Sequence, residues 1–201
     1  MNFSFDNLVI HSESIKERSI RVRSKFKKEW VEAVDEFSKF YVSLETSPKS
    51  TLRNVKLLLS TRFFNHVFSS LTLAEAGLLA DAIVCERSSI ETLAGYKLVC
   101  VAPDHANKYN TDKFPKPVEV RKKLESLGFT EEVENIRGVY KSASGITHLN
   151  RDHERFSMDW ENENTGVLNI GGAYDQTDIE HMIWFLPKLI HWYLMPIKKN
   201  G

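Results

Sequence analysis

The chain has 201 residues, of which 42% are hydrophobic and 27% are charged, a composition typical of a soluble globular protein. This length supports one well-buried core and is short for two full domains. Lys and Arg together number 27, as do Asp and Glu, so the formal net charge is zero. A strongly basic protein, attracted as a whole to nucleic acid or to an anionic membrane, is thereby excluded.

A long N-terminal amphipathic helix is expected at 12–46. Apolar residues recur there every three or four positions, as at Val22 and Phe26, with charged residues between them. The basic run at 18–28 has two interpretations, a phosphate-binding strip or a solvated helix face, and the acidic residues that follow it favour the solvated face. The Ser-Pro-Lys-Ser turn at 47–50 ends this helix.

Two further helices are expected, at about 52–69 and 73–101. The second is apolar around almost its whole circumference, as is typical of a helix at the centre of a bundle. It nevertheless carries Arg87 and Glu91, four residues apart on a central apolar stripe. Charges on such a stripe are costly unless they are paired. If the pair is buried, replacing Glu91 by alanine should cost about 3–5 kcal/mol, because Arg87 would be left alone.

Two more helices are predicted after a loop at 114–117. The first begins near Val118 and is closed by Gly128, because glycine commonly occupies the position just after a helix end. The second begins at Thr130, with acidic residues in its first turn, and ends near His148.

The last part of the chain combines a small β element with a final helix. Short alternating runs around 162–166 predict a hairpin-like insert, and a last helix is expected from about 175 to 197. Because no alternation of strands and helices occurs, an all-α fold is favoured over an α/β fold. The predicted fold is all-α: a single domain over 1–201, built as a bundle of five to seven helices with a small β-hairpin-like insert before the last helix.

A polar ridge is the strongest candidate for a functional site. Tyr140, Ser144 and His148 are spaced four residues apart, which places them along one slanted line of a helix, here called the 140–148 ridge. A polar ridge that faces a core needs partners, and the charges on the central helix are Arg87 and Glu91. We therefore expect these five residues to meet between two helices. The result is either a binding or catalytic pocket, with His148 as acid–base group, or a buried network that fixes helix register.

Metal and cofactor sites are not expected. The segment HLNRDHE at 148–154 contains several side chains that can bind metals, but its spacing matches no standard ligand pattern, and a solvated loop is favoured. No P-loop and no G-x-G-x-x-G motif occurs, so no cofactor is predicted. Cys85 and Cys100 are separated by about 22 Å on one predicted helix, too far for a disulfide, and are interpreted as reduced thiols.

The chain is expected to be cytoplasmic and not to bind membranes. Residues 1–19 lack the basic segment and the continuous apolar stretch of a secretory signal. The apolar stretch at 181–197 is interrupted by Pro187 and Lys188 and is shorter than the roughly 20 residues that a membrane-spanning helix needs. Its aromatic residues are expected in the core or, where exposed, at a contact between two copies of the chain.

The Arg-x-x-x-Glu pattern at 87–91, followed some fifty residues later by the 140–148 ridge, resembles uncharacterised bacterial all-helical domains related to the HEPN superfamily. The resemblance covers 70–195 and implies an HEPN-like helical core there, with the same five residues as its site. Many members of that superfamily cleave RNA in toxin or defence systems, and others are inactive binding modules. Active members carry an arginine followed, after four to six residues, by a histidine, a spacing that this chain lacks.

These observations favour a non-catalytic HEPN-like binding module, with a small anionic ligand, RNA or a protein as partner, in a bacterial defence or stress system. The alternative is a metal-independent phosphodiesterase or ribonuclease in which His148 is the general acid–base group and Arg87 stabilises the phosphate. A third hypothesis is a homo-oligomer built on the last helix. The sequence leaves open whether the protein is an enzyme.

Overall fold

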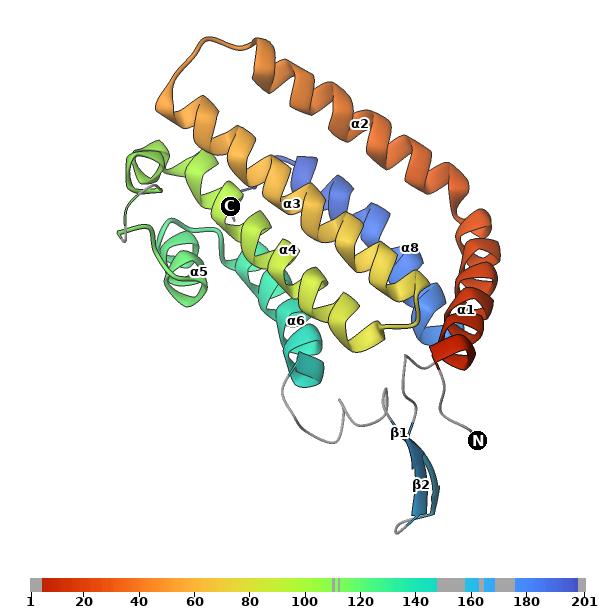
Figure 1. Ribbon diagram of the computed structural model, residues 1–201. Coiled ribbons are helices and arrows are strands. Elements are labelled where there is room, and N and C mark those ends of the chain that lie inside the picture. Colours follow the sequence, from red (N-terminus) through yellow and green to blue (C-terminus); the bar gives the residue numbers. More distant parts are fainter. Residues whose placement is uncertain are drawn as a thin grey trace.

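The computed structural model describes residues 5–109, 111, 113–147, 158–162, 165–168 and 176–198. These residues form seven α-helices, one 3-10 helix and two short strands (Figure 1). The helices are α1 Phe5–Lys25, α2 Lys27–Thr46, α3 Thr51–Glu75, α4 Leu79–Val101, η1 Pro103–Lys108, α5 Pro117–Ser126, α6 Thr130–Thr147 and α8 Gln176–Leu194. The predicted all-helical bundle is therefore confirmed, with one helix more than the predicted upper limit when η1 is counted.

The two strands lie between α6 and α8 in the chain. They are β1 Met158–Asn162 and β2 Thr165–Leu168, and they pair antiparallel.

The single helix predicted at 12–46 is wrong, because the structure has two helices there. The backbone leaves the helical region at Phe26, where φ is −110° and ψ is 17°. Phe26 packs against the core at this point, and both α1 and α2 pack against α8. The two helices meet at a bend (Figure 1), which allows each of them to follow the surface of the bundle.

The boundary between the second and third predicted helices is also wrong. α3 continues to Glu75, six residues beyond the predicted end at Ser69, so no new helix begins at 73. The chain turns at Gly77 instead, where φ is 79°, a conformation that glycine adopts without strain. The Leu78 N–H then donates to the Leu73 carbonyl at 2.9 Å, which closes the helix end.

α4 lies at the centre of the bundle, as its apolar circumference predicts. It packs against α3, α5, α6 and α8, and its residues from Thr92 to Val99 are all buried. Among the described residues, the largest fully buried side chain is Tyr193 of α8, whose ring centroid lies 4.1 Å from that of Phe63 and 4.3 Å from that of Tyr96. This aromatic stack joins α3, α4 and α8.

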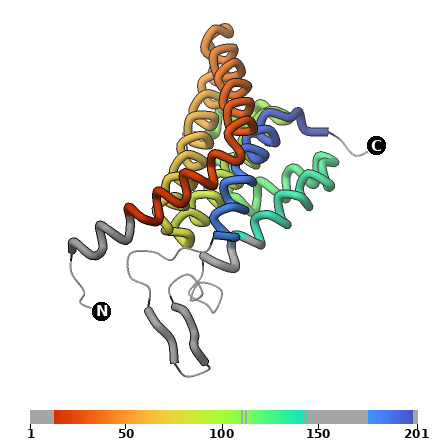
Figure 2. Tube along the Cα trace, turned by 90° about the vertical axis from the view of Figure 1, so that its right-hand side faces the viewer, coloured from red at the N-terminus to blue at the C-terminus, as the bar shows by residue number. Residues whose placement is uncertain are grey.

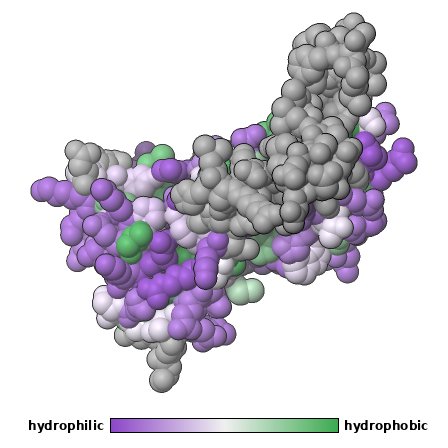
Figure 3. Space-filling model, turned by 90° about the horizontal axis from the view of Figure 1, so that it is seen from below, coloured by the Kyte–Doolittle hydropathy of each residue, from purple (hydrophilic) through white to green (hydrophobic). Residues whose placement is uncertain are grey.

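The last helix buries its apolar side within the chain. Ile179, Ile183, Leu186 and Ile190 of α8 are fully buried. No helix in the described part of the chain is long and apolar enough to cross a membrane. Viewed from below, the described surface is mostly hydrophilic (Figure 3). Helices α2 and α3 lie side by side and form the upper part of the molecule (Figure 2).

Candidate functional site

Three of the five predicted site residues, Arg87, Glu91 and Tyr140, lie together between α4 and α6. Arg87 Nη2 donates to the Tyr140 hydroxyl over 2.5 Å, and Arg87 Nε lies 3.4 Å from Glu91 Oε1. The Arg87 Cζ atom is 4.8 Å from the centre of the Tyr140 ring, so the guanidinium also makes a cation–π contact. Two segments far apart in the sequence therefore meet at the positions that the sequence indicated.

The other two predicted site residues cannot be placed with these three. Ser144 belongs to α6, but its side chain lies outside the described residues, as do His148 and the whole HLNRDHE segment at 148–154. The end of the 140–148 ridge and the catalytic role of His148 therefore stay predictions. Among the described side chains, no group of three or more His, Cys, Asp and Glu residues is placed to hold a metal ion.

The structure adds Arg121 of α5, which the sequence analysis did not identify. Its Cζ atom lies 4.5 Å from the centre of the Tyr140 ring, and only 8% of the residue is exposed. Its Nη1 atom is buried and has no hydrogen-bond partner in the described part of the chain. A signal was present in the sequence, because Arg121 lies on the same side of α5 as the buried Leu124, three residues later.

Arg87, Glu91, Arg121 and Tyr140 form what we call the arginine–tyrosine cluster. Two guanidinium groups approach one phenol ring, and the Glu91 carboxylate lies beside one of them, that of Arg87. The Tyr140 hydroxyl accepts a hydrogen bond from Arg87, which leaves its own proton available for donation. Guanidinium and hydroxyl donors that converge in this way are suited to bind an oxyanion.

The Arg87–Glu91 pair is less buried than the sequence suggested. Both side chains are 28% exposed, so water screens the pair, and the loss of 3–5 kcal/mol expected for a buried pair does not apply. We now expect Glu91→Ala to lower the free energy of unfolding by about 1 kcal/mol or less. Equilibrium urea unfolding measures this change, and a loss above about 3 kcal/mol would show that the pair behaves as a buried one.

A second acidic group lies next to the cluster in sequence. Glu86 of α4 is partly buried, and burial raises the pKa of its carboxyl from 4.5 to about 7. A carboxyl with a pKa in this range exists in both protonation states at neutral pH, which is the property required of a general acid or base. Glu86 was not predicted from the sequence, because an acid on a buried helix has no distinctive spacing.

The described cluster thus draws on three helices, with Arg87 and Glu91 from α4, Arg121 from α5 and Tyr140 from α6. Comparison of the chain with protein-family models, with curated proteins and with solved structures gives no match. The chemistry of the arginine–tyrosine cluster is therefore the basis on which a function can be assigned.

Proposed function

We propose that this chain is a helical binding module that holds a small anionic ligand, through a phosphate-like oxyanion, at the arginine–tyrosine cluster. The observation that carries this proposal is Arg121, a buried guanidinium whose Nη1 atom has no partner among the described residues. A buried charge without a counter-ion costs free energy. An anion bound at Arg121 would offset this cost and satisfy the unpaired donor.

The neighbours of Arg121 support an anion at this position. Arg87 supplies a second guanidinium on the same ring, and Tyr140 supplies a hydroxyl donor. With Glu91 included, the cluster has two positive charges and one negative charge. The excess of guanidinium groups over carboxylates among these four residues favours a small anion as the ligand. RNA binding rests on a broad basic surface, and this chain has no net positive charge.

A relationship to the HEPN superfamily, and with it a role in bacterial defence or stress, is part of this proposal. It is supported by the all-helical bundle and by the contact between Arg87 and Tyr140. Binding is proposed in preference to phosphodiester cleavage, because the chain lacks the spacing from arginine to histidine that active members of that superfamily carry.

Inorganic phosphate is the simplest probe of the proposed site. If the dissociation constant is about 1 mM, about 20 mM phosphate should raise the free energy of unfolding of the wild type by about 2 kcal/mol. Arg121→Met should remove this gain. Without phosphate, the same variant should be at least as stable as the wild type, because it loses a buried charge that has no ion-pair partner among the described residues. Urea unfolding in phosphate and in sodium chloride of equal ionic strength measures both effects.

Arg137→Met is the matched control. Arg137 is an exposed arginine of α6 whose Nη2 atom lies 2.8 Å from Glu125 Oε2, so its replacement should leave the phosphate response unchanged. The proposal fails if phosphate stabilises the wild type no more than chloride does. Equal stabilisation of the wild type and of Arg121→Met would place the bound anion elsewhere on the protein.

A further inference from the structure

His66 of α3 lies at the level of the arginine–tyrosine cluster. α3 and α4 run antiparallel and pack along each other, and Figure 1 shows α4 between α3 and α6. The register of the two helices is fixed where Ser70 Oγ donates to the Ala82 carbonyl at 2.8 Å. His66 precedes Ser70 by one helical turn. In an antiparallel pair it therefore lies level with the turn of α4 that follows Ala82, which is the turn that carries Arg87.

The imidazole of His66 is held in its neutral form by Arg62. Arg62 Nε donates to His66 Nε2 at 3.4 Å. A ring nitrogen that accepts a hydrogen bond carries no proton, so the ring proton of the neutral imidazole is on Nδ1. His66 is partly buried, and its burial and the Arg62 charge both lower the pKa of the ring. The ring is therefore neutral at pH 7.

Glu91 of α4 links His66 to the arginine–tyrosine cluster. Within the described part of the chain, the charged groups that act on the His66 ring are Arg62 of its own helix and Glu91. The Glu91 carboxylate raises the pKa of the ring, because it attracts the protonated form. The same carboxylate lies 3.4 Å from Arg87 Nε. A negative charge at this position repels an anion bound at the cluster and competes with it for Arg87.

We propose that His66 couples anion binding at the arginine–tyrosine cluster to protonation: the protonated ring pairs with Glu91, and the cluster then binds its anion more tightly. This inference rests on the proposed function. Protonation makes both ring nitrogens donors, so the bond from Arg62 is lost and the ring is drawn to Glu91. Arg62 is exposed and can turn toward the solvent. A Glu91 carboxylate paired with an imidazolium repels the anion less and attracts Arg87 less strongly.

Sulfate is the probe for this coupling, because its charge stays constant between about pH 5.5 and about pH 8, whereas that of phosphate changes. Urea unfolding at several sulfate concentrations gives the dissociation constant. Arg121→Met, measured in parallel, subtracts the general effect of sulfate on protein stability. All proteins carry Glu86→Gln, because the Glu86 carboxyl, with a pKa of about 7, titrates in the same pH range. The Glu86→Gln protein is the parent of the variants below.

The pH dependence of sulfate binding should disappear without the imidazole. For the parent, we expect a dissociation constant about fivefold lower at about pH 5.5 than at about pH 8. His66→Gln should remove this difference, because glutamine cannot take up a proton, although its amide oxygen can still accept from Arg62. His105→Gln is the matched control. His105 of η1 is also partly buried, burial likewise lowers its pKa, and its replacement should leave the difference in place.

Glu91→Gln tests the partner of the protonated ring. At about pH 8 this variant should bind sulfate about fivefold more tightly than the parent does, because the opposing negative charge is absent. An unchanged affinity at this pH would overturn Glu91 as the partner of His66. The coupling is also overturned if the parent binds sulfate equally at both pH values, or if His66→Gln keeps the difference, and the proposed function stands in both cases. Sulfate that stabilises the parent no more than Arg121→Met would overturn the coupling and the proposed function together.

Discussion

Lys97→Ala is expected to lower the free energy of unfolding by about 3–5 kcal/mol. Lys97 of α4 is only 2% exposed. Its Nζ atom donates to the Trp192 carbonyl at 2.9 Å and to the Met195 carbonyl, and it lies 3.6 Å from Glu132 Oε1. Alanine would leave the end of α8 and the Glu132 carboxylate without their cation. Equilibrium urea unfolding, followed by circular dichroism, measures the loss.

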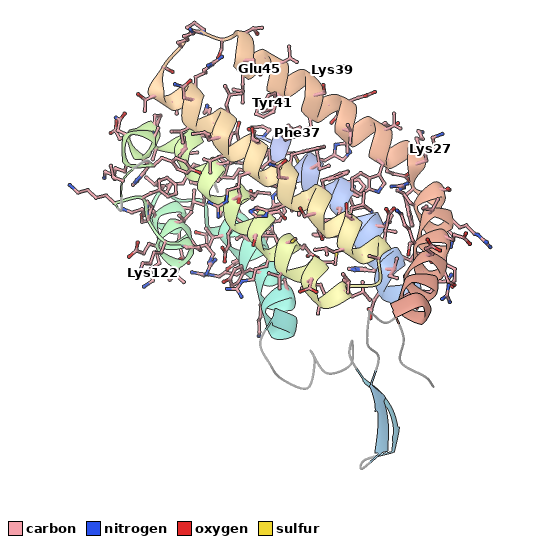
Figure 4. The ribbon with its side chains drawn as sticks, viewed as in Figure 1. Lys27, Phe37, Lys39, Tyr41, Glu45 and Lys122 are labelled. Carbon is pink, nitrogen blue, oxygen red and sulfur yellow. The ribbon has the colours of Figure 1, made fainter. Side chains whose placement is uncertain are left out.

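Two variants show whether that loss comes from the missing charge. Lys122→Ala changes an exposed lysine of α5 (Figure 4) and should alter the free energy of unfolding by no more than about 0.5 kcal/mol. The double change Lys97→Met and Glu132→Leu removes both charged groups and should recover much of the stability, because no buried charge is then left unpaired. A loss below about 1 kcal/mol for Lys97→Ala would show that the ammonium is not needed at this position.

Lys97 also has consequences for the candidate site. Burial lowers the pKa of Lys97, and the nearby Glu132 carboxylate acts in the opposite direction. Glu132 also accepts a hydrogen bond from Trp192 Nε1 at 3.0 Å, so this network joins α4, α6 and α8. It holds the N-terminal part of α6, while the contact between Arg87 and Tyr140 holds α6 further along. We therefore expect the network to help position Tyr140.

The central helix and the helix end marked by Gly128 were predictable from local chemistry. α4 is apolar on all sides and lies in the middle of the bundle. Gly128, at φ 90°, follows the end of α5, and α6 begins at Thr130. The break at Phe26 was not predictable, because apolar residues continue through it at intervals of three and four. The chain bends there to pack against α8, a helix about 150 residues later in the sequence.

Part of the candidate site was predictable because a charge on an apolar helix face requires a partner. This reasoning led to Arg87, Glu91 and Tyr140, which the structure brings together. It applies equally to Lys97 and Arg121, but the carbonyl partners of Lys97 belong to the backbone of α8 and leave no trace in the sequence. Periodicity shows on which side of a helix a residue lies, but it does not show how deeply that residue is buried. The Arg87–Glu91 pair was therefore expected to be more deeply buried than the structure shows.

Glu86 should make the stability of the protein depend on pH between about 4.5 and 7. Burial raises the pKa of its carboxyl from 4.5 to about 7 in the folded state. The folded protein therefore holds a proton that the unfolded chain releases as the pH rises through this range. The contribution of the protonated Glu86 carboxyl to the free energy of unfolding is complete below pH 4.5 and is lost as the pH rises to about 7. With the partial exposure of Glu86 taken into account, the loss should be about 2–3 kcal/mol.

Glu86→Gln separates this effect from every other titrating group. Glutamine cannot ionise, so the variant should be as stable as the wild type at about pH 4 and more stable by about 2–3 kcal/mol at about pH 8. Glu134→Gln, the control, changes an exposed acid of α6. Its free energy of unfolding should differ from that of the wild type by the same amount at both pH values. Urea unfolding at a series of pH values measures all three proteins. A constant difference in the free energy of unfolding between Glu86→Gln and the wild type across this range would contradict the prediction. Glu86 would then ionise in the folded protein as it does in the unfolded chain, and its carboxyl would not serve as an acid–base group at neutral pH.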